Sequence, residues 1–146
     1  MYPKLKTPLI LAPMFHVTNV AFRMLCRKYG ASMAITELLS SHALAHDYQK
    51  EYDIIDVAPN EKPVAIQLFG ENTEEMAQAT EKVMGRCDVV DVNMGCPSPR
   101  IMNQCAGSAL LDNPKKVKAM IEAMSGHGHP ISVKMRSGRK KNNAIA

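Results

Sequence analysis

Short apolar segments alternate with helical patterns along the sequence, and this alternation limits the fold more than any other feature. Segments of aliphatic and β-branched residues, closed by Gly, Pro or polar residues, indicate five strands. They are Pro8–Met14, Met33–Leu39, Pro63–Gly70, Val89–Asn93 and Ile131–Arg136. Strand and helix recur at intervals of roughly 30 residues, which is typical of parallel βαβ units. We therefore predict an α/β fold in which even the first of these strands is buried.

Capping residues mark the ends of the helices expected between the strands. Thr18 or Asn19 precedes the first helical pattern and Gly30 follows it. Asn72 or Thr73 precedes the third, and the pair Asn113-Pro114 opens the fourth. The expected helices are 20–29, 40–49, 73–84 and 114–124, with a polar loop over 51–61.

Two architectures fit such an alternation, an open doubly wound sheet and a TIM (β/α)8 barrel. The dinucleotide-binding pattern G-x-G-x-x-G does not follow the first strand, which disfavours the doubly wound version. Polar side chains stand in the carboxyl-terminal halves of the predicted strands. In a barrel such residues meet at one rim and build the active site. They are Glu37, Gln67, Asn93, Lys134 and Arg136, and we predict the barrel.

The length of the chain bounds how much of a barrel it can form. A complete (β/α)8 barrel takes about 250 residues, and this sequence has 146. We expect only about the first five β/α units, with residues 1–146 as the amino-terminal part of the barrel. The last residues, NNAIA at 142–146, have the pattern of a further helix.

The segment Val89–Arg100 places a thiol at the end of a strand. Alternation along a strand sends Val90 and Val92 to one face and two polar residues to the other. A buried strand face that holds polar side chains needs partners for them. Gly95 then permits a tight turn, and prolines stiffen the chain after Cys96. The segment therefore predicts a thiol held on a rigid turn at the carboxyl end of a strand.

Composition excludes several classes of protein. The four cysteines form no C-x-x-C pair and no histidine stands at metal-ligand spacing, so we expect reduced thiols of a cytoplasmic protein and no metal site. The amino terminus lacks the apolar core of a signal peptide, and no apolar segment approaches the ~18 residues of a membrane span. The net charge of +4 is compatible with a nucleic-acid partner. The oligomeric state stays open.

Six motifs together resemble the tRNA-dihydrouridine synthase family. In order, they are LAPMxxVTNxxFR at 11–23, TELLS at 36–40, QLFG at 67–70, DVNMGCPSPRI at 91–101, GSALL at 107–111 and VKMRSG at 133–138. The resemblance implies an FMN-binding barrel followed by a smaller helical domain that binds tRNA. It also implies an enzyme that reduces chosen uridines of tRNA to 5,6-dihydrouridine, with NADPH as the reductant of the flavin.

The resemblance also implies roles for particular residues. Cys96 matches the catalytic cysteine and Asn93 the asparagine that holds the target uracil. The backbone of the segment Pro13, Met14 and Phe15 matches the one that lies against the flavin ring. Gln67 and Lys134 match side chains that bind the flavin, and Arg136 is expected to reach substrate or flavin. The chain departs from the family pattern at Phe15-His16, where small residues are usual, and at Asn19, where Asp is usual.

The chemistry of uridine reduction suits an acidic thiol. Saturating the C5–C6 bond of uracil requires a hydride at C6, which the resemblance assigns to reduced flavin, and a proton at C5. An unperturbed cysteine has a pKa of ~8.5, so it is protonated at pH 7 and still acidic enough to donate. A nucleophilic role would need an adjacent base, and no histidine is near Cys96 in sequence. Two alternatives remain, a dihydroorotate dehydrogenase-like FMN barrel and a truncated, non-catalytic remnant.

Overall fold

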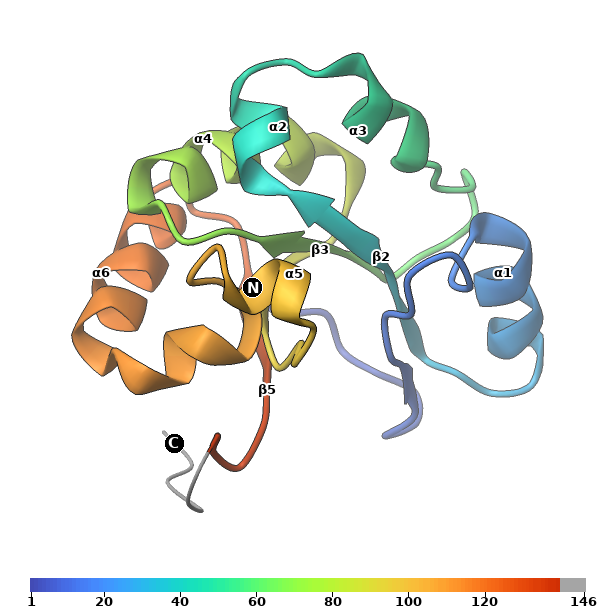
Figure 1. Cartoon of the computed structure of the whole chain (residues 1–146). Helices are drawn as coiled ribbons and strands as arrows, with labels where there is room; N and C mark the ends of the chain where they lie inside the picture. The colour runs from blue at the N-terminus through green and yellow to red at the C-terminus, as the bar shows by residue number, and fades with distance from the viewer. Residues whose placement is uncertain (140–146) are drawn as a thin grey trace.

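Five parallel strands form one curled sheet in the order β1-β2-β3-β4-β5 (Figure 1). The structure is a computed structural model and describes residues 1–139. Strands that neighbour each other in sequence order are typical of a barrel, whereas a doubly wound sheet reverses its order part-way. The predicted partial TIM barrel is therefore confirmed. The strands are β1 Ile10–Leu11, β2 Met33–Ser40, β3 Val64–Phe69, β4 Val89–Met94 and β5 Ile131–Met135.

Helices cover the outer, convex side of this sheet, where α6, α4, α2, α3 and α1 follow one another in an arc (Figure 1). The predicted caps are present: Asn19 caps α1, Asn72 caps α4, and Asn113 caps α6 with Pro114 at its first position. The α-helices are α1 Val20–Lys28, α2 Ser41–Ala45, α3 Gln49–Ile54, α4 Thr73–Val83, α5 Pro99–Met102 and α6 Pro114–Ser125; two 3₁₀ turns are η1 Met84–Arg86 and η2 Gly107–Asp112.

Alternating side chains divide the two faces of the central strands. On β4, Val90 and Val92 pack outward into the main hydrophobic core beneath α4 and α6. Asp91 and Asn93 lie on the opposite, inner face, as the sequence pattern predicted. The core includes Leu39, Leu44, Ile66, Leu68, Met76, Val83, Met94, Leu110, Met120 and Met124.

The inner face changes character along the strands. Near their amino-terminal ends, Met33, Ile35, Ala65 and Val89 form a second apolar cluster against which Leu5 packs. Toward the carboxyl-terminal ends the inner face carries amide and carboxyl groups. The half-barrel therefore has an apolar floor and a polar rim, which is the arrangement of a barrel that keeps its site at one end.

A β-bulge in β2 changes which side chains face inward. The register with β3 pairs Ile35 with Ala65 but Leu38 with Gln67, so β2 has one residue more than its partner there. A bulge shifts the alternation by one, and Leu38 rather than Glu37 takes the inward position. Glu37, one of the polar residues expected at the rim, therefore does not face the barrel interior, and its carboxylate accepts a hydrogen bond from the backbone N–H of His16 at 2.5 Å.

Two predicted elements differ from the structure. The first strand is only two residues long and its Ile10 is 42% exposed, because β1 has a strand neighbour on one side only within residues 1–139. The expected helix 40–49 is split into α2 and α3, and α3 takes up part of the expected loop. Asp47, with a φ of 58°, interrupts the helix in the left-handed region. The helix expected from NNAIA lies outside the described residues.

Candidate active site

A cavity of about 210 Å³ opens at the carboxyl-terminal ends of the strands. Its lining includes most of the residues singled out in the sequence: Pro13, Phe15, Gln67, Asn93, Cys96 and Lys134, joined by Leu38 and Gly95. These residues come from separate segments of the chain, and the sheet brings them together. The predicted residues Met14 and Arg136 do not line this cavity.

Asn93 holds the turn that carries the thiol. Its Oδ1 accepts hydrogen bonds from the backbone N–H of Gly95 at 3.2 Å and of Cys96 at 3.0 Å. Its Nδ2 donates to Gln67 Oε1 at 2.9 Å. Because backbone N–H groups can only donate, they fix the orientation of the Asn93 amide. Within residues 1–139, the other N–H of Nδ2 has no partner and remains for a ligand.

The same directionality continues inward to a buried carboxylate. Gln67 has to present Oε1 to Asn93, so its Nε2 points the other way and donates to Asp91 Oδ2 at 2.6 Å. Asp91 Oδ1 accepts from the Ser132 hydroxyl at 2.5 Å. The end of this chain of amides must be an acceptor, and a carboxylate can only accept. Asp91 is therefore the acceptor at which the amide orientation set by the N–H groups of Gly95 and Cys96 ends.

Burial raises the pKa of the Asp91 carboxyl above its usual value. Hydrogen bonds from Ser132 and Gln67, and the positive charge of Lys134, act in the opposite direction. The position of Asp91 beneath Gln67, with hydrogen bonds from both Gln67 and Ser132, makes it the buried acceptor of the polar network.

Cys96 is held from both sides while its thiol stays available. Its N–H is bound by Asn93, and its carbonyl accepts a hydrogen bond from the N–H of Ser108 at 3.0 Å. Gly107, with a φ of 61°, packs against Cys96, and a Cβ at position 107 would lie 2.8 Å from the Cys96 carbonyl oxygen. Among residues 1–139, no group hydrogen-bonds the half-buried Sγ of Cys96. Its proton is therefore not engaged by the described part of the protein.

A buried ion pair fixes the segment that carries Pro13 and Phe15. The hydroxyl of Thr18 bonds both the N–H and the carbonyl of Met14, each at 3.1 Å. The Thr18 carbonyl accepts from Arg23 Nη1 at 2.6 Å. Arg23 is 2% exposed and forms a two-point ion pair with Glu61, with contacts of 2.5 and 2.9 Å. Arg23 thus anchors the loop after β1, a role that sequence reasoning missed.

The two basic residues of β5 have separate surroundings. Lys134 pairs with Asn93 in the ladder and lines the cavity, and no carboxylate within residues 1–139 forms a salt bridge with it. Arg136 donates from Nε to the Gly95 carbonyl at 2.7 Å. It lies beside a different hollow of about 420 Å³, lined also by Pro97, Met102 and Ser108. Arg136 therefore supports the thiol turn from the other side.

Comparison with known proteins assigns the chain to a family. The model of the dihydrouridine synthase (Dus) family matches residues 10–145. The chain belongs to the dihydrouridine synthase family. It is 39% identical over 137 residues to tRNA-dihydrouridine synthase B of Shewanella oneidensis, covering 92% of this chain and 42% of that protein. It is 36% identical over 142 residues to a probable tRNA-dihydrouridine synthase of Aquifex aeolicus, covering 93% and 45%.

A third relative is also matched over only part of its length. The NAD(P)(+)-type tRNA-dihydrouridine(47) synthase of Cryptococcus neoformans is 35% identical over 136 residues, which is 88% of this chain and 19% of that protein. The chain thus spans less than half the length of each of these relatives. Membership of the dihydrouridine synthase family confirms the resemblance seen in the motifs and decides against the dihydroorotate dehydrogenase-like alternative.

The lining of the cavity fits one end of a flavin, the cofactor expected for a dihydrouridine synthase. A flat, mostly apolar ring with a polar edge matches walls made by Pro13, Phe15 and Leu38 beside Gln67 and Lys134. The volume of about 210 Å³ is below the ~300–1,000 Å³ of typical ligand sites. The described part of the chain therefore suits the ring rather than the whole nucleotide.

Some site residues left little signal in the sequence. Leu38 is brought inward by the bulge, which apolar alternation does not reveal. Gly107 belongs to the GSALL motif, but its contact with Cys96 requires the turn through α5.

Within residues 1–139, none of the helices has the length and apolar character needed to cross a bilayer.

Proposed function

We propose that this chain supplies the uridine-reducing face of a flavin-dependent tRNA-dihydrouridine synthase. The observation that supports the proposal most is one cavity lined by Cys96, Asn93, Gln67 and Lys134, in a chain of the dihydrouridine synthase family. The substrate is a uridine of tRNA, the cofactor is FMN, and NADPH is the reductant. A uridine must leave its stack to enter such a cavity, so the base is extruded before reaction.

In this proposal Cys96 is the general acid. A bound, reduced flavin would supply the hydride for C6 of the uracil, and the Cys96 thiol would give its proton to C5. A positioned general acid typically contributes ~10²–10⁴-fold in rate. The Sγ on a backbone held by Asn93 and Ser108 suits this task, because no group within residues 1–139 takes up the thiol proton or fixes its direction.

Asn93 binds the uracil as a donor in this proposal. Its Oδ1 already accepts two backbone hydrogen bonds, so the remaining N–H of Nδ2 is the group that can reach a carbonyl oxygen of the base. The amide therefore both orients the Cys96 turn and contacts the substrate. Arg136 holds Gly95 and lies beside the neighbouring hollow, so its proposed contact with substrate or flavin would be made by its terminal nitrogens from outside the cavity.

The flavin would be held by three parts of the cavity. The backbone of Pro13, Met14 and Phe15 faces the ring, and Gln67 binds its polar edge. Lys134 would place its ammonium group beside the ring, where its positive charge would stabilise negative charge on a reduced flavin. We propose that residues 1–146 are the amino-terminal part of the barrel. The remaining strands and a helical tRNA-binding domain would come from sequence beyond these residues in the full protein, which we expect to be cytoplasmic.

Flavin binding and dihydrouridine formation test the proposal in two steps. FMN is titrated into the purified chain, and flavin fluorescence and absorbance report binding. Dihydrouridine is then measured in a tRNA transcript incubated with the chain, FMN and NADPH. We expect Cys96→Ala to keep FMN binding and to lower the rate by ~10²-fold or more. The matched control is Cys105→Ala, which removes an exposed thiol outside the cavity.

Each step has an outcome that contradicts the proposal. If FMN does not bind, the chain is a non-catalytic part of its family and the proposal fails for residues 1–146. If FMN binds and Cys96→Ala retains the rate of Cys105→Ala, the assignment of Cys96 as the acid is wrong.

A further inference from the structure

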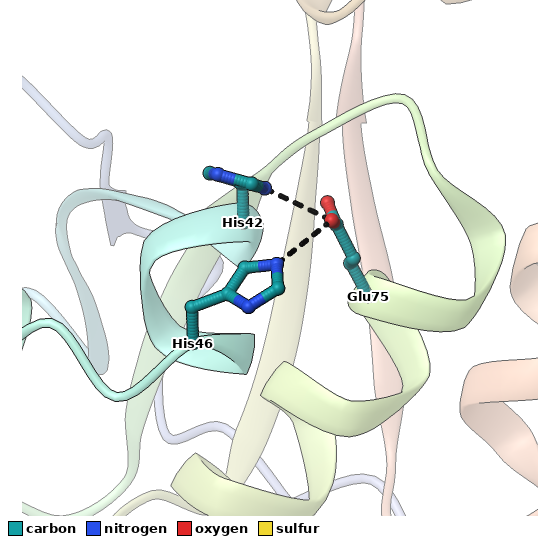
Figure 2. A group of neighbouring side chains, drawn as sticks. All are labelled: His42, His46 and Glu75. Atoms are coloured by element: carbon teal, nitrogen blue, oxygen red, sulfur yellow. Dashed lines mark hydrogen bonds and ion pairs between the residues drawn. The ribbon is translucent and has the colours of Figure 1, made fainter.

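Two histidines and a glutamate converge on the outer side of the sheet, away from the cavity that holds Cys96. His42 lies on α2, His46 immediately follows it, and Glu75 lies in the first turn of α4 (Figure 2). One side-chain ligand atom from each of the three residues lies within 4.8 Å of the other two. We propose that His42, His46 and Glu75 bind a divalent transition-metal ion of the zinc class.

The geometry of the three side chains suits a single ion. His42 Nδ1 lies 2.9 Å from Glu75 Oε1, and His46 Nε2 lies 3.4 Å from the same oxygen (Figure 2). Ligand atoms bound at about 2.0–2.2 Å in tetrahedral geometry stand about 3.3 Å apart. The three ligand atoms lie at most 4.8 Å apart, so rotations of the side chains would bring them to the spacing that an ion between the two imidazoles and the carboxylate requires.

The identity of the donors selects the metal. Two imidazole nitrogens and one carboxylate oxygen make a His₂Glu set, which zinc uses with a fourth position left open. Imidazole disfavours Mg²⁺ and Ca²⁺, which prefer oxygen ligands. His42 and His46 are 59% and 53% exposed, so water can occupy the open position. The carboxylate of Glu75 supplies a negative charge that a cation offsets.

The packing of α2 against α4 holds the ligands in place before any ion binds. Leu44 of α2 and Met76 of α4 are fully buried in the shared core. Lys82 of α4 donates to the carbonyls of Leu44 and Ala45, each at 2.9 Å, at the carboxyl end of α2. Residues four apart on a helix share a face, so His42 and His46 both point toward α4 (Figure 2). The packing of α2 on α4 therefore reduces the conformational entropy that is lost when an ion binds.

Sequence reasoning assigned no metal site, and the spacing of these two histidines was the signal that it missed. The third ligand comes from an element 33 residues away from His42, which only the tertiary structure brings close. An adjacent hollow of about 310 Å³ is lined by His42 and Glu75, together with Ser41, whose buried hydroxyl has no hydrogen-bond partner among residues 1–139. The site stands independently of the proposed uridine reduction.

Zinc binding to the metal-free chain tests the proposal. Zn²⁺ is titrated into the chelator-treated 146-residue protein by calorimetry, and we expect one equivalent to bind. His46→Gln and Glu75→Gln should each weaken that binding at least tenfold. The matched controls are Glu74→Gln, which removes an exposed carboxylate in the same turn, and His127→Gln; both should bind as the wild type does. His46 is exposed and Glu75 lies outside the core, so neither change alters core packing.

Cobalt provides a second measurement that identifies the ligand atoms. Co²⁺ bound to nitrogen and oxygen shows visible absorption without the intense thiolate-to-metal band, and the wild type should give that spectrum. A thiolate band, no binding of Zn²⁺, or binding that His46→Gln and Glu75→Gln leave unchanged would overturn the proposal.

Discussion

The direction of the hydrogen bonds along Asn93, Gln67 and Asp91 gives a sharp prediction for Gln67→Glu. The substitution preserves shape but replaces the Nε2 donor with an oxygen, so two carboxyl oxygens would face each other where 2.6 Å now separates donor and acceptor. Gln67 and Asp91 are 0% and 2% exposed, so water cannot separate them. One carboxyl must take up a proton for the pair to persist.

The free energy needed to keep that carboxyl protonated sets the size of the destabilisation. Keeping a carboxyl with an ordinary pKa of ~4.3 protonated at pH 7 costs about 1.4 kcal/mol per pH unit, or about 3–4 kcal/mol in total. Losses of this size match those for a buried charge without a partner, about 3–5 kcal/mol. Burial already raises the pKa of Asp91, and a neighbouring carboxylate would raise it further.

The sign of the pH dependence follows from the raised pKa in the folded state. The folded protein then binds more protons than the unfolded chain, so the free energy of unfolding falls as pH rises. The destabilisation by Gln67→Glu should be fully present at pH 7. The destabilisation should shrink by about 1.4 kcal/mol per pH unit as the pH falls toward 5, because protonating the carboxyl then requires less free energy.

A second substitution distinguishes this account from simple disruption of packing. When Gln67→Glu is combined with Asp91→Asn, the new amide at position 91 donates to the introduced carboxylate from one side as Asn93 does from the other. Ser132 can still donate to the amide oxygen. The double variant has the same net charge as the wild type and all partners restored, so we expect it to recover at least about 2 kcal/mol. Asp91→Asn alone should cost about 1 kcal/mol or less, because Ser132 can accept from the new amide.

Urea unfolding at pH 7 and pH 5, followed by circular dichroism, measures all four proteins. A pH-independent loss in Gln67→Glu would refute the reasoning. So would a double variant no more stable than Gln67→Glu, since that would mean that the orientation of the amides is not fixed by the N–H groups of Gly95 and Cys96.

Two further predictions concern cysteines and the turn beside them. In Gly107→Ala, the new Cβ would lie 2.8 Å from both the Cys96 carbonyl oxygen and Ile101 Cγ2. We therefore expect the free energy of unfolding to fall by about 1–3 kcal/mol and the reaction rate of the Cys96 thiol with a disulfide reagent to change. An unchanged rate would contradict the contact between Gly107 and the Cys96 turn. Burial raises the pKa of the Cys87 thiol to about 11, so at pH 8 only about a thousandth of it is thiolate and it should alkylate far more slowly than exposed Cys105. Peptide mapping after iodoacetamide treatment compares the two, and equal labelling of the native chain would argue against the buried environment of Cys87.

Several features followed from the sequence because they depend on local rules. Helix caps at Asn19, Asn72 and Asn113 reflect side-chain bonds to N–H groups two or three residues away. The alternation of valines with Asp91 and Asn93 placed polar groups on one face of β4, because successive side chains of a strand point to opposite sides. The order of strands and helices predicted the barrel, and the motif around Cys96 helped to indicate the family.

Other features depend on contacts between distant segments, and only the tertiary structure decided them. The bulge in β2 moved Glu37 away from the cavity and Leu38 into it, because register is set by the pairing of two strands rather than by either sequence. Arg23 and Glu61 are 38 residues apart in sequence, yet together they hold the loop that carries Pro13.

By itself, then, the sequence determined which elements form, where the polar residues fall along each strand, and which residue types the chemistry has available. The tertiary structure decided how those residues use their hydrogen-bonding groups. An asparagine side chain offers both a donor and an acceptor, whereas in the folded chain two backbone N–H groups occupy the oxygen of Asn93. The physical reason is that a donor or acceptor is satisfied by whatever group lies within about 3 Å, and at that range neighbours are set by folding.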